Sequence, residues 1–240
     1  MSENFSPKDY GWTVWEDFLT NDAITDGLIG KMSWELVALS AGADTLTYET
    51  AQGETFMRMT GTGGGANDGT AVSLAADKVS FGQYGGECRF GFRIPNITGN
   101  TIAGQVARIG FSSVIAETEP VVGLWCDVAA GVVSFDAASA NGDVTAAAAG
   151  PTSILTSGTT AILGTTYDAV IKWWGNNGNA DPGPSSASLS LNGHQVALFN
   201  GSVLIDGAET LEPAIIHYAT GASTLELDVF YYEAFSYRSK

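Results

Sequence analysis

The sequence predicts an all-β fold, in which a short N-terminal arm precedes a single β-sandwich domain. Short runs rich in Thr, Val, Phe and alternating apolar residues recur along the chain, separated by Gly, Asn and Asp. Only 15% of the residues are charged, whereas amphipathic helices need many Lys, Glu and Gln side chains on their outer faces. The closing stretch, residues 223–237, alternates in character as a long strand does, and we expect it to lie beside the first strand.

The expected strands follow one another from residue 45 onward, at the spacing typical of a sandwich. Asn192-Gly193 predicts a type I′ turn between alternating arms, and Ala130-Gly131 marks a second tight hairpin. No change of composition divides the 240 residues, so we expect 17–240 to form one domain. The expected strands are 45–49, 55–60, 70–74, 87–94, 107–112, 121–128, 131–137, 167–174, the two arms of the hairpin 187–199, then 215–218 and 225–235; the turn-rich segments 61–69, 137–150 and 176–185 are expected loops.

Residues 1–16 form the predicted arm, which is polar at first and then aromatic. Its aromatic side chains carry large apolar areas that are unfavourable to leave in water. They either pack on the arm's own domain or contact a neighbouring subunit, and we take them as candidate partner-binding residues: Phe5, Tyr10, Trp12 and Trp15. The segment lacks the basic and apolar regions of a secretory signal, so we expect synthesis in a cytoplasm.

Charge and cysteine usage exclude several classes of partner and cofactor. The formal net charge is −16 with ten Lys plus Arg, which predicts no binding to nucleic acid or to an anionic membrane surface. No apolar run approaches the roughly 18 residues that span a bilayer. Cys88 and Cys126 lie in apolar segments and are expected to be buried, reduced thiols. His194 and His217 are distant from both cysteines, so we expect no zinc site and no cofactor.

One pair of carboxylates invites a catalytic interpretation. Glu226 and Asp228 are two residues apart on a predicted strand and share a face, as the two acids of a retaining glycosidase can do at about 5 Å. Some β-sandwich glycosidases use a Glu-x-Asp-x-x-Glu strand, but here the third acid falls on Tyr231. Glu233 is expected on the opposite face of the strand. We therefore expect a structural strand rather than an enzyme.

Other motifs that carry chemistry are incomplete. No serine stands in a Gly-x-Ser-x-Gly elbow, and the glycine-rich segment 60–70 lacks the Lys-Ser/Thr of a phosphate loop. Several oxygen-bearing loop side chains could coordinate Ca²⁺, but their spacing fits turns better. These side chains are Asn67, Asp68, Asn176, Asn179 and Asp181.

Aromatic side chains offer a different surface. Neighbours on a strand point to opposite faces, so Trp173-Trp174 and Tyr231-Tyr232 should each supply one outward ring, and Trp125 is a further candidate. Outward rings on a sandwich suit either a carbohydrate or a neighbouring subunit. The residues alone do not choose between these ligands.

Several segments together resemble concanavalin-A-like and laminin-G-like jelly rolls. They are Asp17-Phe18 followed by Trp34, the stretch G-E-T-F-M-R-M-T, the element Y-D-A-V-I-K-W, the hairpin S-L-S-L-N-G-H-Q-V and the closing L-E-L-D-V-F-Y-Y. The resemblance covers most of 17–237 and implies a jelly roll whose last strand returns beside the first. Members with sugar-cleaving or sugar-binding roles carry catalytic acids or a Ca²⁺ site, which are not matched here.

Such domains recur in tailed-bacteriophage virions, and the resemblance therefore implies a structural role. The expected function is that of a non-enzymatic capsid decoration (cement) protein on the virion surface. Its implied partners are the major capsid protein and copies of itself, as a homotrimer. On this hypothesis residues 1–16 clasp a neighbour and can be deleted without unfolding the sandwich. The alternative is a carbohydrate-binding module of a tail fibre or spike, with a host-surface glycan as its ligand.

Overall fold

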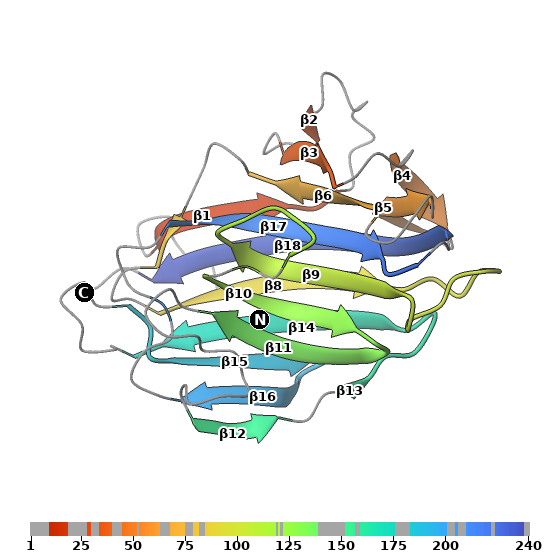
Figure 1. Cartoon of the computed structure of the whole chain (residues 1–240). Helices are drawn as coiled ribbons and strands as arrows, with labels where there is room; N and C mark the ends of the chain where they lie inside the picture. Colours follow the sequence, from red (N-terminus) through yellow and green to blue (C-terminus); the bar gives the residue numbers. More distant parts are fainter. Residues whose placement is uncertain are drawn as a thin grey trace.

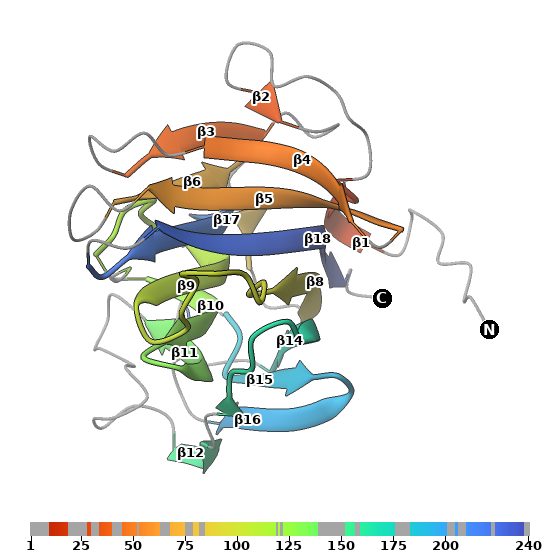
Figure 2. The ribbon, with the colours of Figure 1, turned by 90° about the vertical axis from the view of Figure 1, so that its right-hand side faces the viewer.

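Two antiparallel β-sheets stacked as two layers make up the fold, which confirms the predicted all-β sandwich (Figure 1, Figure 2). This computed structural model describes residues 10–18, 28–29, 34–39, 45–51, 53–62, 68–74, 79–81, 85–118, 120, 122–138, 152–156, 159–175, 183–200, 205, 210–221 and 224–237. Within these ranges every regular element is a β-strand. The same ranges contain no helix that is long and apolar enough to cross a membrane.

The first sheet, called sheet A, is built around the closing strand β18 (Thr224–Tyr237). In spatial order its described strands are β12 (Thr152–Thr156), β16 (His194–Asn200), β15 (Ser186–Leu191), β14 (Thr166–Trp174), β8 (Gly86–Arg93), β18, β5 (Glu54–Thr62) and β4 (Thr45–Ala51). The first strand, β1 (Tyr10–Glu16), also pairs with β18, antiparallel to it. The closing strand thus lies beside the first strand of the chain, but that strand falls within residues 1–16, which were predicted as an arm and not as part of the sheet.

The second sheet, called sheet B, covers the other side of the core. In spatial order its described strands are β13 (Thr159–Thr160), β11 (Val132–Ala138), β10 (Gly123–Ala129), β9 (Gln105–Ser112), β17 (Thr210–Ala219), β6 (Gly69–Ser73), β3 (Trp34–Ala38) and β2 (Leu28–Ile29). The short β7 (Val79–Ser80) pairs with one end of β17. Strands distant in the sequence thus lie side by side in both sheets, as in a jelly roll.

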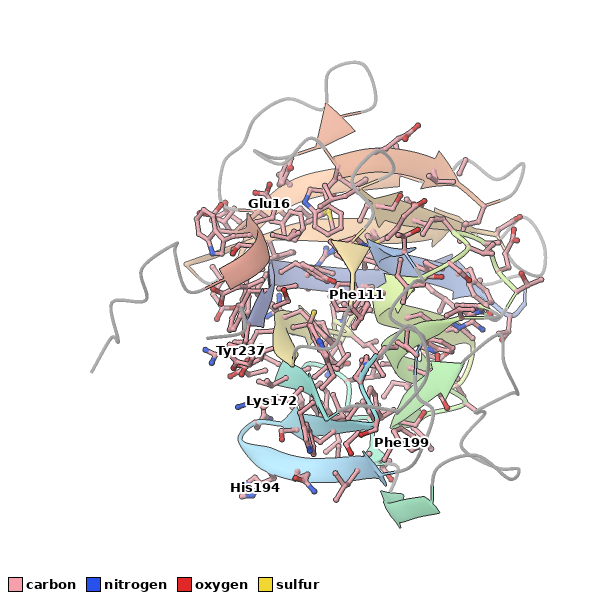
Figure 3. All side chains as sticks on the ribbon, turned by 90° about the vertical axis from the view of Figure 1, so that its left-hand side faces the viewer. Glu16, Phe111, Lys172, His194, Phe199 and Tyr237 are labelled. Carbon is pink, nitrogen blue, oxygen red and sulfur yellow. The ribbon has the colours of Figure 1, made fainter. Side chains whose placement is uncertain are left out.

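Alternating side chains fill the space between the sheets. In β14, Tyr167 and Trp173 are buried, whereas their neighbours Asp168 and Trp174 are exposed, as the period of a strand predicts. Aromatic rings join the two layers: the ring of Trp34 in β3 lies edge-on against Tyr232 in β18, with the ring centroids 5.1 Å apart. Figure 3 shows Phe111 and Phe199 in the interior and Lys172 and His194 at the surface.

Two predictions from local sequence are confirmed by the backbone and the thiols. Asn192 and Gly193 both have positive φ, at 50° and 79°, as a type I′ turn requires, and Ala130 and Gly131 form the second such pair. Cys88 and Cys126 are buried and unpaired. Burial raises the pKa of both thiols, because the low-dielectric interior disfavours the thiolate.

A β-bulge in β18 overturns one prediction. Asp228 pairs with Arg93 and Val229 with Phe92, but the next partner of β8 is Tyr231. Phe230 is therefore an extra residue, and the alternation of the strand shifts by one position after it. Glu233 consequently faces outward like Glu226 and Asp228, and the expectation that it lies on the opposite face is wrong.

Candidate ligand-binding site

Two strands share one edge of β18 and leave a gap between them. Residues 224–229 of β18 pair with β5, and residues 232–237 pair with β1. β1 ends at Glu16, which pairs with Tyr232, while β5 begins at Glu54. The bulge residues Phe230 and Tyr231 lie at the gap. The candidate site is therefore positioned by the meeting of the first, fifth and last strands.

A cavity of about 330 Å³ opens at this gap. Its volume lies at the lower end of the range typical of small-ligand sites. Its walls combine two aromatic rings, two carboxylates and polar backbone: Asp17, Gly53, Glu54, Thr55, Phe230 and Tyr231. Such a set can stack against one face of a ligand and accept hydrogen bonds from its edge.

Asp228 anchors the sheet beside the cavity. Its carboxylate is fully buried and accepts hydrogen bonds from two arginines. The Arg58 Nε lies 2.7 Å from Oδ1, while the Arg93 Nη2 and Nε lie 2.8 Å and 3.0 Å from Oδ2. Since these contacts join β5, β8 and β18, they fix β5 and β18, which line the cavity, to each other and to the neighbouring β8.

The two arginines also lie over aromatic rings on the outer face of sheet A. The guanidinium carbon of Arg93 is 5.1 Å from the ring centroids of both Phe56 and Phe230, and that of Arg58 is 5.2 Å from Phe56. This cover explains why Phe56 is fully buried although it points away from the core. Cation–π contact with Arg93 holds the Phe230 ring in the cavity wall.

A hydrogen bond fixes the side chain of Tyr231. Its hydroxyl donates to Oδ1 of Asp168 on β14. Burial raises the pKa of the Tyr231 hydroxyl, and the bond to Asp168 raises it further because the donor form is favoured. The ring therefore presents a preorganised surface to the cavity at neutral pH.

Glu226 and Asp228 are both engaged in ion pairs with arginines of the sheet. They share a face of the strand, as predicted, and this is the outer face of sheet A, where Glu226 Oε2 lies 3.0 Å from Arg58 Nε. Burial raises the pKa of Glu226, whereas the Arg58 charge lowers it. Asp228 has no exposed surface and is held by two guanidiniums, so this carboxylate cannot reach a sugar ring. The pair does not form a glycosidase site.

Hydrogen bonds from buried polar side chains hold the start of β18 on its core side. Asn100 Oδ1 accepts from the Glu226 N–H at 3.2 Å, and its Nδ2 donates to the Glu226 carbonyl at 3.2 Å. Gln105 Nε2 donates to the carbonyl of Thr101 at 2.8 Å, which leaves its Oε1 to accept from His217 Nε2 at 2.9 Å. The proton of neutral His217 is therefore on Nε2, and Nδ1 has no hydrogen-bond partner among the described residues.

This buried histidine predicts a loss of stability in mild acid. Burial lowers the pKa of His217 from 6.5 to about 4. The unfolded chain therefore binds a proton at this histidine below pH 6.5, whereas the folded chain binds it only below about pH 4. The folded state consequently loses stability as the pH falls through this window. We expect a loss on the order of 2–3 kcal/mol. Urea unfolding at several pH values should show it, and His217→Gln should flatten the profile; an unchanged profile would contradict this role.

Of the predicted partner-binding residues, only Trp15 has a described side chain. Trp15 is 45% exposed on the outer face of β1, where its partner is Glu233. Tyr10 and Trp12 belong to the backbone of β1, but their side chains lie outside the described part, as does all of Phe5. A subunit contact through these residues stays a prediction.

The other loop and aromatic candidates are dispersed. Asp68 is buried just before β6, whereas Asn67, Asn176, Asn179 and Asp181 lie outside the described residues. The residues that the structure describes contain no group of three or more His, Cys, Asp or Glu side chains arranged for a metal ion. Trp125 and Trp173 are buried, while Trp174 is 42% exposed at the end of β14 farther from the cavity.

Comparison with solved structures shows what this architecture is similar to. The carbohydrate recognition domain of Emp47p has a TM-score of 0.56 at 10% identity, with coverage of 98% of this chain and 100% of that domain. A protein of unknown function from Shewanella oneidensis, SO2946, has a TM-score of 0.56 at 13% identity, with coverage of 95% and 89%. The binding domain of Botulinum Neurotoxin DC in complex with SialylT has a TM-score of 0.51 at 9% identity, with coverage of 88% and 45%.

The fold is a lectin-like jelly roll. This confirms the predicted concanavalin-A-like sandwich. No family model matches the chain, and no curated protein sequence matches it either. At identities of 9–13% the likeness concerns the fold, so the ligand has to be argued from the cavity itself.

Proposed function

We propose that the protein is a glycan-binding module and that its ligand occupies the cavity between β1, β5 and β18. The observation that carries the proposal is the combination of two held aromatic rings with two carboxylates around one opening. Carbohydrate binding is the alternative function expected from the sequence. Capsid decoration receives no support from the structures compared.

The cavity has the chemical groups that sugar recognition needs. The apolar face of a pyranose ring can stack on Phe230 or Tyr231, as amphipathic ligands do on aromatic side chains. Asp17 and Glu54 can accept hydrogen bonds from sugar hydroxyls, and bonds to an ionised acceptor are stronger than neutral ones. Because Arg93 and Asp168 hold the rings, little side-chain order has to be gained on binding.

Fold and surface are in keeping with this function. Two of the compared structures are described as carbohydrate-recognition or binding domains of the same architecture. The outer face of sheet A also carries Trp15 and Tyr237, which are 45% and 42% exposed and could extend a contact with a longer chain. The net charge of −16 keeps such a module soluble and free of nucleic acid.

The test is a glycan array followed by titration of the best ligand. Removing a stacking ring from a small site should weaken binding by about tenfold or more, so we expect Tyr231→Ala to raise Kd by this factor. Trp174→Ala, which removes an exposed ring at the far end of the same face, is the matched control and should leave Kd unchanged. Equal affinity of the wild type and Tyr231→Ala would contradict the proposal, as would an array without any ligand.

A further inference from the structure

The charges around the cavity do not balance. Arg58 is paired with Glu49, Glu226 and Asp228, and Arg93 with Asp228 and Glu54. Two guanidiniums are therefore shared among four carboxylates, which leaves a formal charge of −2 on the cluster. Asp17 lies in the cavity wall, and Asp168 accepts from the Tyr231 hydroxyl.

The negative excess reaches the opening. Asp228 is fully buried, but the side chain of Glu54 is 51% exposed and its contact with Arg93 is long, at 3.3 Å. Arg93 directs its Nε and Nη2 to Asp228, so a single nitrogen, Nη1, faces Glu54. The Glu54 carboxylate therefore retains most of its capacity to accept from a ligand.

The aromatic part of the wall has the same preference. The Phe230 ring is already in contact with the Arg93 guanidinium at 5.1 Å, so the ring that remains for a cationic ligand is that of Tyr231. Aromatic faces attract cations through their quadrupole, and carboxylates beside them add to this attraction. Carboxylates next to aromatic faces form an environment suited to an ammonium group and unfavourable for an anion.

We propose that the ligand is a glycan bearing a protonated amine, held with its ammonium group between Glu54, Asp17 and the ring of Tyr231. The inference rests on the proposed function and specifies its ligand class. A sialylated or sulfated glycan would bring like charge to the cluster and is excluded by the same argument. The chain-wide net charge of −16 would also steer a cationic glycan toward the protein at low salt.

The experiment compares two probes of equal length, a glucosamine tetrasaccharide with free amines and its fully N-acetylated counterpart, at a pH where the amine is protonated. We expect the amine form to bind about tenfold more tightly at low salt. This preference should shrink when the ionic strength rises to about 0.5 M, since salt screens exposed charges.

Charge-neutral variants assign the preference to the cavity. Glu54→Gln should weaken binding of the amine form about threefold more than binding of the N-acetylated form, which reduces the preference for the amine by the same factor. Glu35→Gln, which removes one exposed carboxylate from β3 in sheet B, is the control and should retain the full preference. A preference that survives Glu54→Gln intact and falls in Glu35→Gln would overturn the assignment.

The failure of this inference is distinguishable from that of the proposed function. Equal affinity for both probes, or tighter binding of the N-acetylated form with sensitivity to Tyr231→Ala, would overturn the cationic ligand and leave glycan binding in place. Binding of a lysine tetrapeptide as tightly as the glucosamine probe would overturn the restriction to a glycan.

Discussion

Deleting residues 1–16 is expected to lower the free energy of unfolding by about 4 kcal/mol and to abolish glycan binding. The segment contains β1, which covers half of one edge of β18 with five paired residues. It also buries Val14, a contribution of about 1.5–3 kcal/mol, to which each strand hydrogen bond adds about 1 kcal/mol. Urea unfolding followed by circular dichroism measures the loss. This prediction differs from the expectation that residues 1–16 are an arm whose deletion leaves the sandwich folded.

The matched control is a shorter deletion, of residues 1–9, which leaves β1 in place. It retains every described residue of the segment, so its loss of stability and of affinity for the glycan should be smaller than that of the longer deletion. An equal loss in the two deletions, or full stability without residues 1–16, would contradict the role of β1 as a strand of sheet A.

Asp228→Ala is expected to cost about 3–5 kcal/mol of stability. The substitution leaves Arg58 and Arg93 facing each other without the carboxylate that both of them bind. Their side chains are only 15% and 13% exposed, so water can replace few of the lost hydrogen bonds. The change is measured by chemical denaturation of the purified variant.

Glu54→Ala is the control for this prediction. It removes an exposed partner of Arg93 at 3.3 Å, and such a surface pair contributes about 0–1 kcal/mol. If Asp228→Ala cost no more than Glu54→Ala, the buried carboxylate would not be the anchor of the three strands.

Local sequence was sufficient to predict the fold class and much of the architecture. The strand expected at 167–174, with one outward ring in Trp173-Trp174, is β14, and Asn192-Gly193 predicted the turn between β15 and β16. The return of the last strand beside the first followed from the resemblance to jelly rolls, whereas the position of the first strand within residues 10–16 did not. These features depend on a period of two and on short-range turn chemistry, both of which a single sequence carries.

The candidate site could not be predicted in the same way. Its wall combines Asp17, residues 53–55 and residues 230–231, which become neighbours only when β1 and β5 share the edge of β18. The two arginines that bind Asp228 lie 170 and 135 residues away in the sequence. A signal at the sequence level is the G-E-T-F-M-R stretch with an acid on the closing strand, but it does not fix their register.

The bulge at Phe230 is a second feature that the sequence did not predict. Strict alternation placed Glu233 inward, and one additional residue in β18 reversed this. Nothing in the order F-Y-Y-E distinguishes a regular strand from a bulged one, since the choice depends on whether Tyr232 can pack against Trp34 in the other sheet.

The central claim is that a glycan occupies the gap between β1 and β5 along β18. A crystal structure of the protein with the oligosaccharide that binds best tests it most directly. We expect the sugar to stack on Phe230 or Tyr231, with its polar groups on Asp17 and Glu54. A sugar bound elsewhere, at Trp174 or on the outer face of sheet B, with this cavity empty, would contradict the claim.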